Sequence, residues 1–282
     1  MYVSNSQALS KDQIREVAPS VFASAPSEIT GSNYGFVSSI EALKVFEDMG
    51  WKVYGAQESR INALSPEHYT EKEIARQEAR RGFQTHILKL RHDSIEGFKP
   101  TKVGDLWPEI VFRNAHDGRS SFNLSFGLFR LICTNGMVTC EDLAAPIKIK
   151  HEGFRRLDVT SAIEALMMDS SKVWCNVNDM KELELTPDQK VEFGKWALDL
   201  RQDGNKIDPL SIVEPQREGD NASDLFTVFN VAQEYLIRGG LKIVKDNGKT
   251  SKTRGITSIE ENIRVNKELW SQAHQTLNLL AA

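Results

Sequence analysis

The 282-residue sequence has few cysteines, and none of them are paired at the spacing of a metal or redox motif. Cys133 and Cys140 are seven positions apart, and Cys175 lies well downstream. Zinc knuckles and dithiol centres need closely spaced cysteines, so the sequence supports neither kind of site. We expect reduced thiols, as in a cytosolic protein.

Long apolar runs and a secretory leader are also missing. No window approaches the roughly 18 consecutive apolar residues that would indicate a membrane-spanning helix. The N-terminal segment MYVSNSQALSKDQIREV has neither the basic nor the apolar region of a signal peptide. We therefore expect a cytoplasmic protein without a membrane partner, which is the default when no targeting signal is present.

Recognisable catalytic motifs are absent as well. The segment NGKTS at 247–251 ends like a phosphate-binding loop, but the position five before Gly248 is Ile243 rather than glycine. No G-x-S-x-G or H-E-x-x-H motif occurs, and the six histidines are scattered. His86, on the apolar face of a predicted strand, is interpreted as a core residue rather than a ligand. We expect no cofactor and no metal.

The formal net charge is −4, which argues mildly against a general DNA-coating protein. The charge is unevenly distributed. Six basic residues between Arg238 and Arg254 stand against Asp246 alone, a local net charge of +5 that leaves −9 for the rest of the chain. Such a basic loop is either a solvated turn or a docking point for an anionic partner.

Residue patterns predict an α+β fold, with an antiparallel sheet and a packed helix in the first half. A helix is expected over 38–50 and a strand from Trp51, and the strands EIVFRNA and SFNLSFGLFRLI flank the short segment HDGRS. Asp117-Gly118 is suited to the tip of a hairpin, because Gly accepts a positive φ and Asp bonds its own backbone two residues on. We interpret His116-Asp117 as a turn rather than a catalytic pair. The segment TNGMV, at 134–138, predicts a second reversal.

The second half is predicted to be mainly helical. Capping signals at Thr186, Ser223 and Ser258 open three amphipathic helices, and Gly239-Gly240 is expected to stop the middle one. The expected domains are 1–150, a sheet-rich core, and 151–282, a helical region with a linker near 205–222.

Basic residues recur on the predicted strands, interleaved with aromatic residues such as Tyr54 and Phe129. Single-stranded nucleic acid is held by this combination, since Lys and Arg bind phosphates and aromatic rings stack on bases. Taken singly, each residue also fits an ordinary surface cation or core aromatic. The predicted nucleic-acid contacts, including those of the basic loop, are Lys52, Arg60, Lys89, Arg91, Arg113, Arg130, Lys249, Lys252 and Arg254.

Six blocks in one order resemble the family called domain of unknown function 932. They are APSVFA, HILKLRH, EIVFRNAHDGRSSF, GLFRLICTNGMV, FNVAQEYLIRGG and TRGITSIEENIRVNKELW, and they cover nearly the whole chain. The resemblance implies a mobile genetic element as the setting, because members occur on phages, prophages and conjugative plasmids. It implies no particular activity. The acidic middle, 176–224, departs most from the family.

A second similarity is one of element order. A helix ending in EDMGW that leads into a strand and a hairpin resembles the single-strand annealing proteins of the Rad52-like type. This resemblance implies a homo-oligomer that binds the backbone of single-stranded DNA and lets complementary strands pair without chemistry. An acidic body equally suits the alternative, an interaction protein that binds and blocks a host nuclease or restriction system. An enzyme of unrecognised type is third.

Overall fold

The computed structural model describes residues 2–4, 7–92, 106–130, 136–138, 146–201, 207–244 and 249–281. Contacts divide the chain into two compact units. Unit 1 comprises Met1–Gly136 and Ala145–Met168, and unit 2 comprises Met137–Ala144 and Asp169–Ala282. The division falls inside the helix α4 (Arg156–Glu182).

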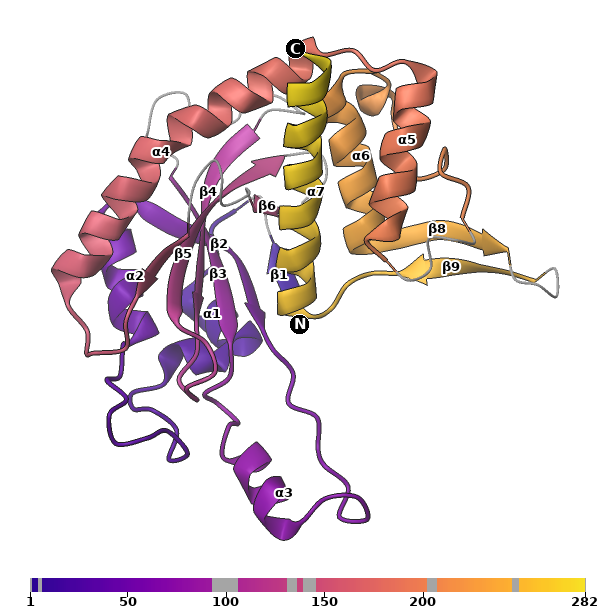
Figure 1. Cartoon of the computed structure of the whole chain (residues 1–282). Coiled ribbons are helices and arrows are strands. Elements are labelled where there is room, and N and C mark those ends of the chain that lie inside the picture. The colour runs from indigo at the N-terminus through magenta and orange to yellow at the C-terminus, as the bar shows by residue number, and fades with distance from the viewer. Residues whose placement is uncertain are drawn as a thin grey trace. The chain divides into compact units, whose positions relative to one another are not determined.

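Unit 1 is built around one antiparallel sheet, whose central strands β2 to β5 lie side by side in Figure 1. The strand order is β1-β2-β3-β4-β5-β6, with β7 also paired to β5. The strands are β1 (Tyr2–Ser4), β2 (Trp51–Glu58), β3 (His86–His92), β4 (Leu106–Asn114), β5 (Phe122–Arg130), β6 (Gly136–Val138) and β7 (Ile147–Ile149).

One face of this sheet forms the core of unit 1. Four apolar residues lie in register across β2 to β5, and all are buried: Val53, Leu90, Ile110 and Phe126. The helix α2 (Ser39–Asp48) packs on this face, with the ring centroid of Phe46 5.9 Å from that of Phe112. The shorter helices α1 (Lys11–Val17) and η1 (Pro19–Phe22) precede it.

A long excursion separates β2 from β3 and projects beyond the ends of the strands in Figure 1. It contains α3 (Glu71–Glu78), a helix without a single buried residue. A helix this short is marginal in isolation, so its capping is important. Thr70 caps it, and the Glu73 carboxylate accepts a hydrogen bond from the Thr70 backbone N–H at 2.8 Å.

Unit 2 contains the helices α5 (Pro187–Asp199), α6 (Leu225–Arg238) and α7 (Ile259–Leu280). Nearly every residue of α6 is buried, polar ones included. Gln233 therefore donates to the Asn266 side chain on α7 at 2.6 Å, and Glu234 accepts two hydrogen bonds from Arg217 at 2.7 and 2.6 Å. Arg217 precedes the short helix η3 (Glu218–Asp220).

A two-stranded hairpin follows α6 directly: β8 (Gly239–Val244) and β9 (Thr250–Arg254). In Figure 1 it extends away from α5, α6 and α7. Gly239-Gly240 was predicted only to end the preceding helix, and this prediction is incomplete, because the same two glycines begin β8. Both have positive φ, +76° and +103°, which lets the chain turn from helix into strand without steric cost.

The predicted α+β fold is confirmed. The hairpin turn between β4 and β5 has Gly118 at φ +76°, and Asp117 Oδ1 accepts the backbone N–H of Arg119 two residues on. The middle helix of unit 2 is capped by Asp224 rather than by Ser223, a shift of one residue.

Only one of the three cysteines lies among the described residues. Cys175 is a free, exposed thiol, whereas Cys133, Cys140 and Asn135 of the second predicted reversal lie outside the described residues. Among the helices that the structure describes, none combines the length and apolar character that a membrane crossing requires.

Candidate nucleic-acid interface and buried polar network

Two of the cations predicted to contact phosphate are buried instead. Arg91 is 0% exposed and Lys89 is 8% exposed. Arg91 Nη2 lies 2.8 Å and Lys89 Nζ 3.7 Å from the carboxylate of Glu109, which is also fully buried on the neighbouring strand. The prediction is wrong for these two residues, because their charge compensates a carboxylate inside the protein.

Aromatic rings complete this buried cluster. The Arg91 guanidinium carbon lies 5.1 Å from the ring centroid of Tyr54 and 5.4 Å from that of Trp107. The two rings contact each other, with centroids 4.8 Å apart. Tyr54 was predicted to stack on a base, but it is 4% exposed and its ring packs against Trp107 and Arg91 within the protein. Phe129 has no described side chain.

The other predicted cations of the sheet are spread out. Lys52 and Arg60 are exposed, Arg113 is partly buried and donates from Nε to Ser120 Oγ at 2.9 Å, and the side chain of Arg130 lies outside the described part. Lys52 pairs with Arg91 and Arg113 with Ile87. These partners are four residues apart on β3, or about 13 Å. Among the predicted residues whose side chains the structure describes, the sheet therefore gathers no exposed basic patch.

The hairpin β8–β9 does gather basic residues. Lys242 lies directly opposite Lys252 in the register, and both are exposed. Arg254, the last residue of β9, and Lys249, which directly precedes the strand, are exposed as well. Like charges directly opposite each other on antiparallel strands destabilise the pair, so this arrangement has an energetic cost in the isolated protein.

The position of the hairpin is fixed at its base, where the backbones of the two strands lie close together. A Cβ added to Gly239 would lie 2.4 Å from the carbonyl oxygen of Thr253, so only glycine fits there. Leu241 and Thr253 are buried on the inward side, and the Leu241 backbone N–H donates to Thr253 Oγ1 at 3.0 Å. Strand alternation then directs Lys242, Lys252 and Arg254 outward.

A second group of functional side chains lies buried where α2 meets the end of the sheet in unit 1. Ser39, in the first turn of α2, has its Oγ 2.8 Å from His86 Nε2, 3.2 Å from His116 Nε2 and 2.9 Å from Asn114 Nδ2. Ser20 Oγ lies 2.8 Å from His86 Nδ1. All five residues are buried, which confirms that His86 is a core residue.

Donor and acceptor chemistry assigns the protons of this network. The Gln84 carbonyl, 3.2 Å from His86 Nδ1, only accepts, which places the ring proton of His86 on Nδ1. Ser39 then donates to His86 Nε2 and accepts from His116 Nε2–H. His116 Nδ1, buried without a hydrogen-bond partner, is left as a bare acceptor.

Both histidines of the network are held neutral. Burial, followed by the charge of His116, lowers the pKa of His86 to about 3. Burial lowers the pKa of His116 to about 4, with a further contribution from His151 and an opposing one from Asp117. This neutral pair of histidines is hydrogen-bonded to Ser20, Ser39 and the Gln84 carbonyl, and it is a structural feature of the core.

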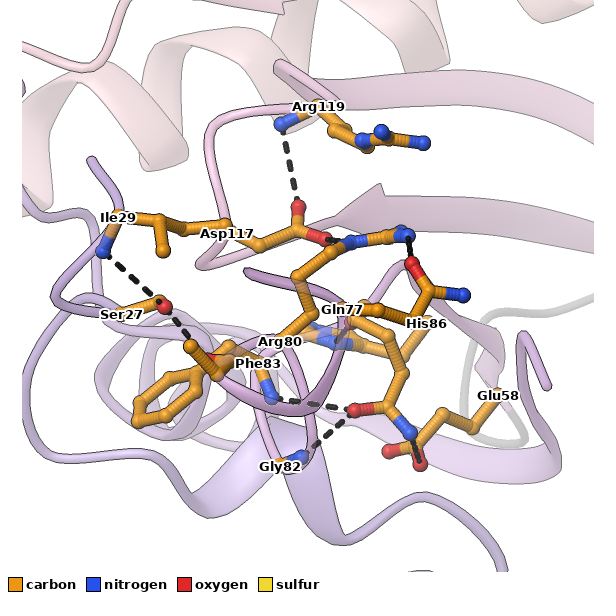
Figure 2. A network of polar contacts seen from close by, with 12 residues as sticks. Ser27, Ile29, Glu58, Gln77, Arg80, Gly82, Phe83, His86, Asp117 and Arg119 are labelled. Carbon is orange, nitrogen blue, oxygen red and sulfur yellow. Dashed lines mark hydrogen bonds and ion pairs between the residues drawn. The ribbon is translucent and has the colours of Figure 1, made fainter. Parts of the chain in front are cut away.

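Asp117 connects the β4–β5 turn to the excursion that carries α3 through an ion pair with Arg80, as Figure 2 shows. Arg80 Nε donates to Asp117 Oδ2 at 2.8 Å, and Arg80 Nη1 donates to Gln77 Oε1 at 3.0 Å. Ser27 Oγ also holds this excursion, because it donates to the Ala79 carbonyl at 2.6 Å. The pair of Arg80 with the buried Asp117 carboxylate accounts for the presence of a charged residue at this turn.

No metal site accompanies these groups. Within the described ranges, no three His, Cys, Asp or Glu side chains gather as metal ligands would.

Comparison with known proteins gives the chain its family. The family model described as "Domain of unknown function (DUF932)" matches residues 26–270. The chain belongs to the DUF932 family.

Two curated relatives of this DUF932 protein come from Escherichia coli (strain K12). They are UPF0380 protein YafZ and UPF0380 protein YfjQ, each 28% identical over 278 residues, which cover 96% of this chain and 93% of the relative. No solved structure matches.

Sequence reasoning missed the partner of the buried cations and the network around Ser39. Glu109 lies in the strand EIVFRNA, which the sequence predicted. A carboxylate in such an apolar strand was the available signal that a cation is buried beside it. The network had none, because Ser20, Ser39 and His86 come from three separate elements and His116 comes from the β4–β5 turn.

Proposed function

We propose that this DUF932 protein binds single-stranded DNA through the basic face of the β8–β9 hairpin and promotes annealing of complementary strands without catalysing a reaction. The observation that supports this most is the register of the hairpin, with exposed Lys242 opposite exposed Lys252. Their ammonium groups repel each other, and a phosphate placed between them replaces repulsion by attraction.

The proposed contacts explain why binding would be independent of sequence. Lys242, Lys249, Lys252 and Arg254 reach phosphates, which carry no sequence information. Base edges then stay accessible to a complementary strand, and a homo-oligomer holds two strands near each other. The mobile-element setting, on a phage or plasmid, is part of the proposal, since annealing serves recombination of such elements.

A β-ribbon contact is favoured over insertion of a helix. The helix that leads into the hairpin, α6, has its residues buried from Leu225 to Ile237 except for Tyr235. A helix that binds nucleic acid must present its side chains to the nucleic acid, so α6 is not available for that role.

The test is fluorescence anisotropy of a labelled 30-nucleotide single strand and of its duplex, titrated with the full chain at low salt. The proposal expects tighter binding of the single strand, and it expects faster pairing of two complementary strands in a fluorescence-quenching assay. Binding of neither form would overturn it. The alternative of a host defence protein as partner would then take its place.

A further inference from the structure

A groove in unit 1 lies between β7 and the first turns of α4. Its volume is about 410 Å³, and it is lined on one side by residues between Ile147 and Arg155 and on the other by Asp158, Ser161, Ala162 and Ala165. This volume is within the range of sites that take a small organic ligand.

The charges of the groove are mostly on its rim. Lys148 is exposed, the side chain of Lys150 is 85% exposed and that of Arg155 is 73% exposed. The two carboxylates in the lining pair with these cations, Glu152 with Lys150 at 3.8 Å and Asp158 with Arg155 at 2.7 Å. Ion pairs this exposed contribute little, so both cations can exchange a carboxylate for a phosphate.

Three cations against two carboxylates leave the lining with one net positive charge. One phosphodiester carries one negative charge, so the groove matches a single nucleotide in both charge and volume. Ile147 and Ile149 are partly exposed in the lining, and Ala165 is exposed opposite them. Small and apolar side chains between cations offer a surface on which a base or sugar can lie.

We propose that this groove holds one nucleotide of a bound single strand, with its phosphate between Lys148 and Arg155 and its base against the apolar lining. This inference rests on the proposed function, and it adds a second contact on a different unit from the hairpin. The strand would thereby gain a fixed nucleotide in addition to the sequence-independent contacts of the hairpin.

The test uses a single strand in which every thymine is replaced by photoreactive 5-bromouracil, cross-linked to the full chain and mapped by mass spectrometry. The expected cross-links include the segment 147–165. Two variants block the groove differently: K148E/R155E reverses charge, and A165W fills the space without changing charge. K148E/R155E is expected to weaken binding about tenfold, as for loss of a charged hydrogen bond, and A165W is expected to weaken it by excluding the base from the groove; both should remove the cross-links at 147–165.

The outcomes separate the two proposals. The hairpin variant K242E/K252E should bind more weakly and still cross-link at 147–165 when the strand is in excess. If wild-type protein binds DNA but both groove variants retain wild-type affinity, and no cross-link falls at 147–165, the groove is not a binding site and the hairpin proposal stands. If wild-type protein binds no DNA, both proposals fail. Melting temperatures of the variants establish that they fold.

Discussion

The two buried histidines predict that the protein loses stability between pH 7 and pH 5, before carboxylates titrate. In the folded state the pKa of His86 is about 3 and that of His116 about 4. In the unfolded chain both titrate near 6.5. A lowered folded pKa means that the unfolded chain binds more protons below pH 6.5. Stability is therefore complete above this pH and falls as the pH falls toward the folded values.

The magnitude follows from proton binding by the unfolded state. Each histidine contributes a slope of up to about 1.4 kcal/mol per pH unit below pH 6.5. Over pH 7 to 5 this gives about 2 kcal/mol for each histidine and about 4 kcal/mol for the pair. Burial also lowers the pKa of His151, which acts in the same direction, whereas burial raises the pKa of Glu58, which acts in the opposite one.

The assay is urea unfolding, followed by tryptophan fluorescence at half-unit steps from pH 7.5 to 5. The variant H116Q should lose about half of the slope. H68Q, which removes an exposed histidine outside the network, should keep the wild-type slope. A free energy of unfolding that stays constant over this range, or NMR signals of His86 and His116 in the folded protein that titrate near 6.5, would refute the reasoning.

Two further substitutions test the packing. E109Q leaves two buried cations without their carboxylate and should lower the free energy of unfolding by about 3–5 kcal/mol, whereas E152Q at an exposed pair should change it by less than about 0.5 kcal/mol. G239A places a Cβ against backbone at a positive φ and should speed amide exchange in the hairpin by at least tenfold, whereas G31A, which meets nothing within 4 Å, should leave that exchange unchanged. Equal urea midpoints for E109Q and E152Q, or equal exchange for G239A and G31A, would contradict the respective argument.

Local signals in the sequence predicted most helices and strands. Capping residues and turn residues act within a few positions, so Thr186 with Gln189 and Asp117 with Gly118 are readable without tertiary information. At Ser258 the cap is present, but Glu261 pairs with Arg264 instead of returning to the cap backbone. A neighbouring arginine competes for this carboxylate, which a capping pattern does not reveal.

The alternation of polar and apolar residues along the strands did not predict which cations of the sheet are exposed to solvent. The rule that polar residues on a strand face solvent fails for β3, whose residues from His86 to Arg91 are all buried. Arg91 is tolerated there because register places Glu109 opposite it, and register is a property of two strands rather than one. The basic hairpin was noticed as a loop because its alternation is short and follows two glycines.

The measurement that tests the central proposal most directly is the salt dependence of single-strand binding in a charge-reversal pair. Four phosphate contacts from the hairpin predict a log–log slope of about −2.8 and a loss of about fifty-fold between 50 and 200 mM salt. K242E/K252E should reduce the slope by about half, whereas K72E/K195E, with the same change in net charge at exposed lysines elsewhere, should keep it. Identical slopes for the two variants would show that the hairpin does not contact the strand.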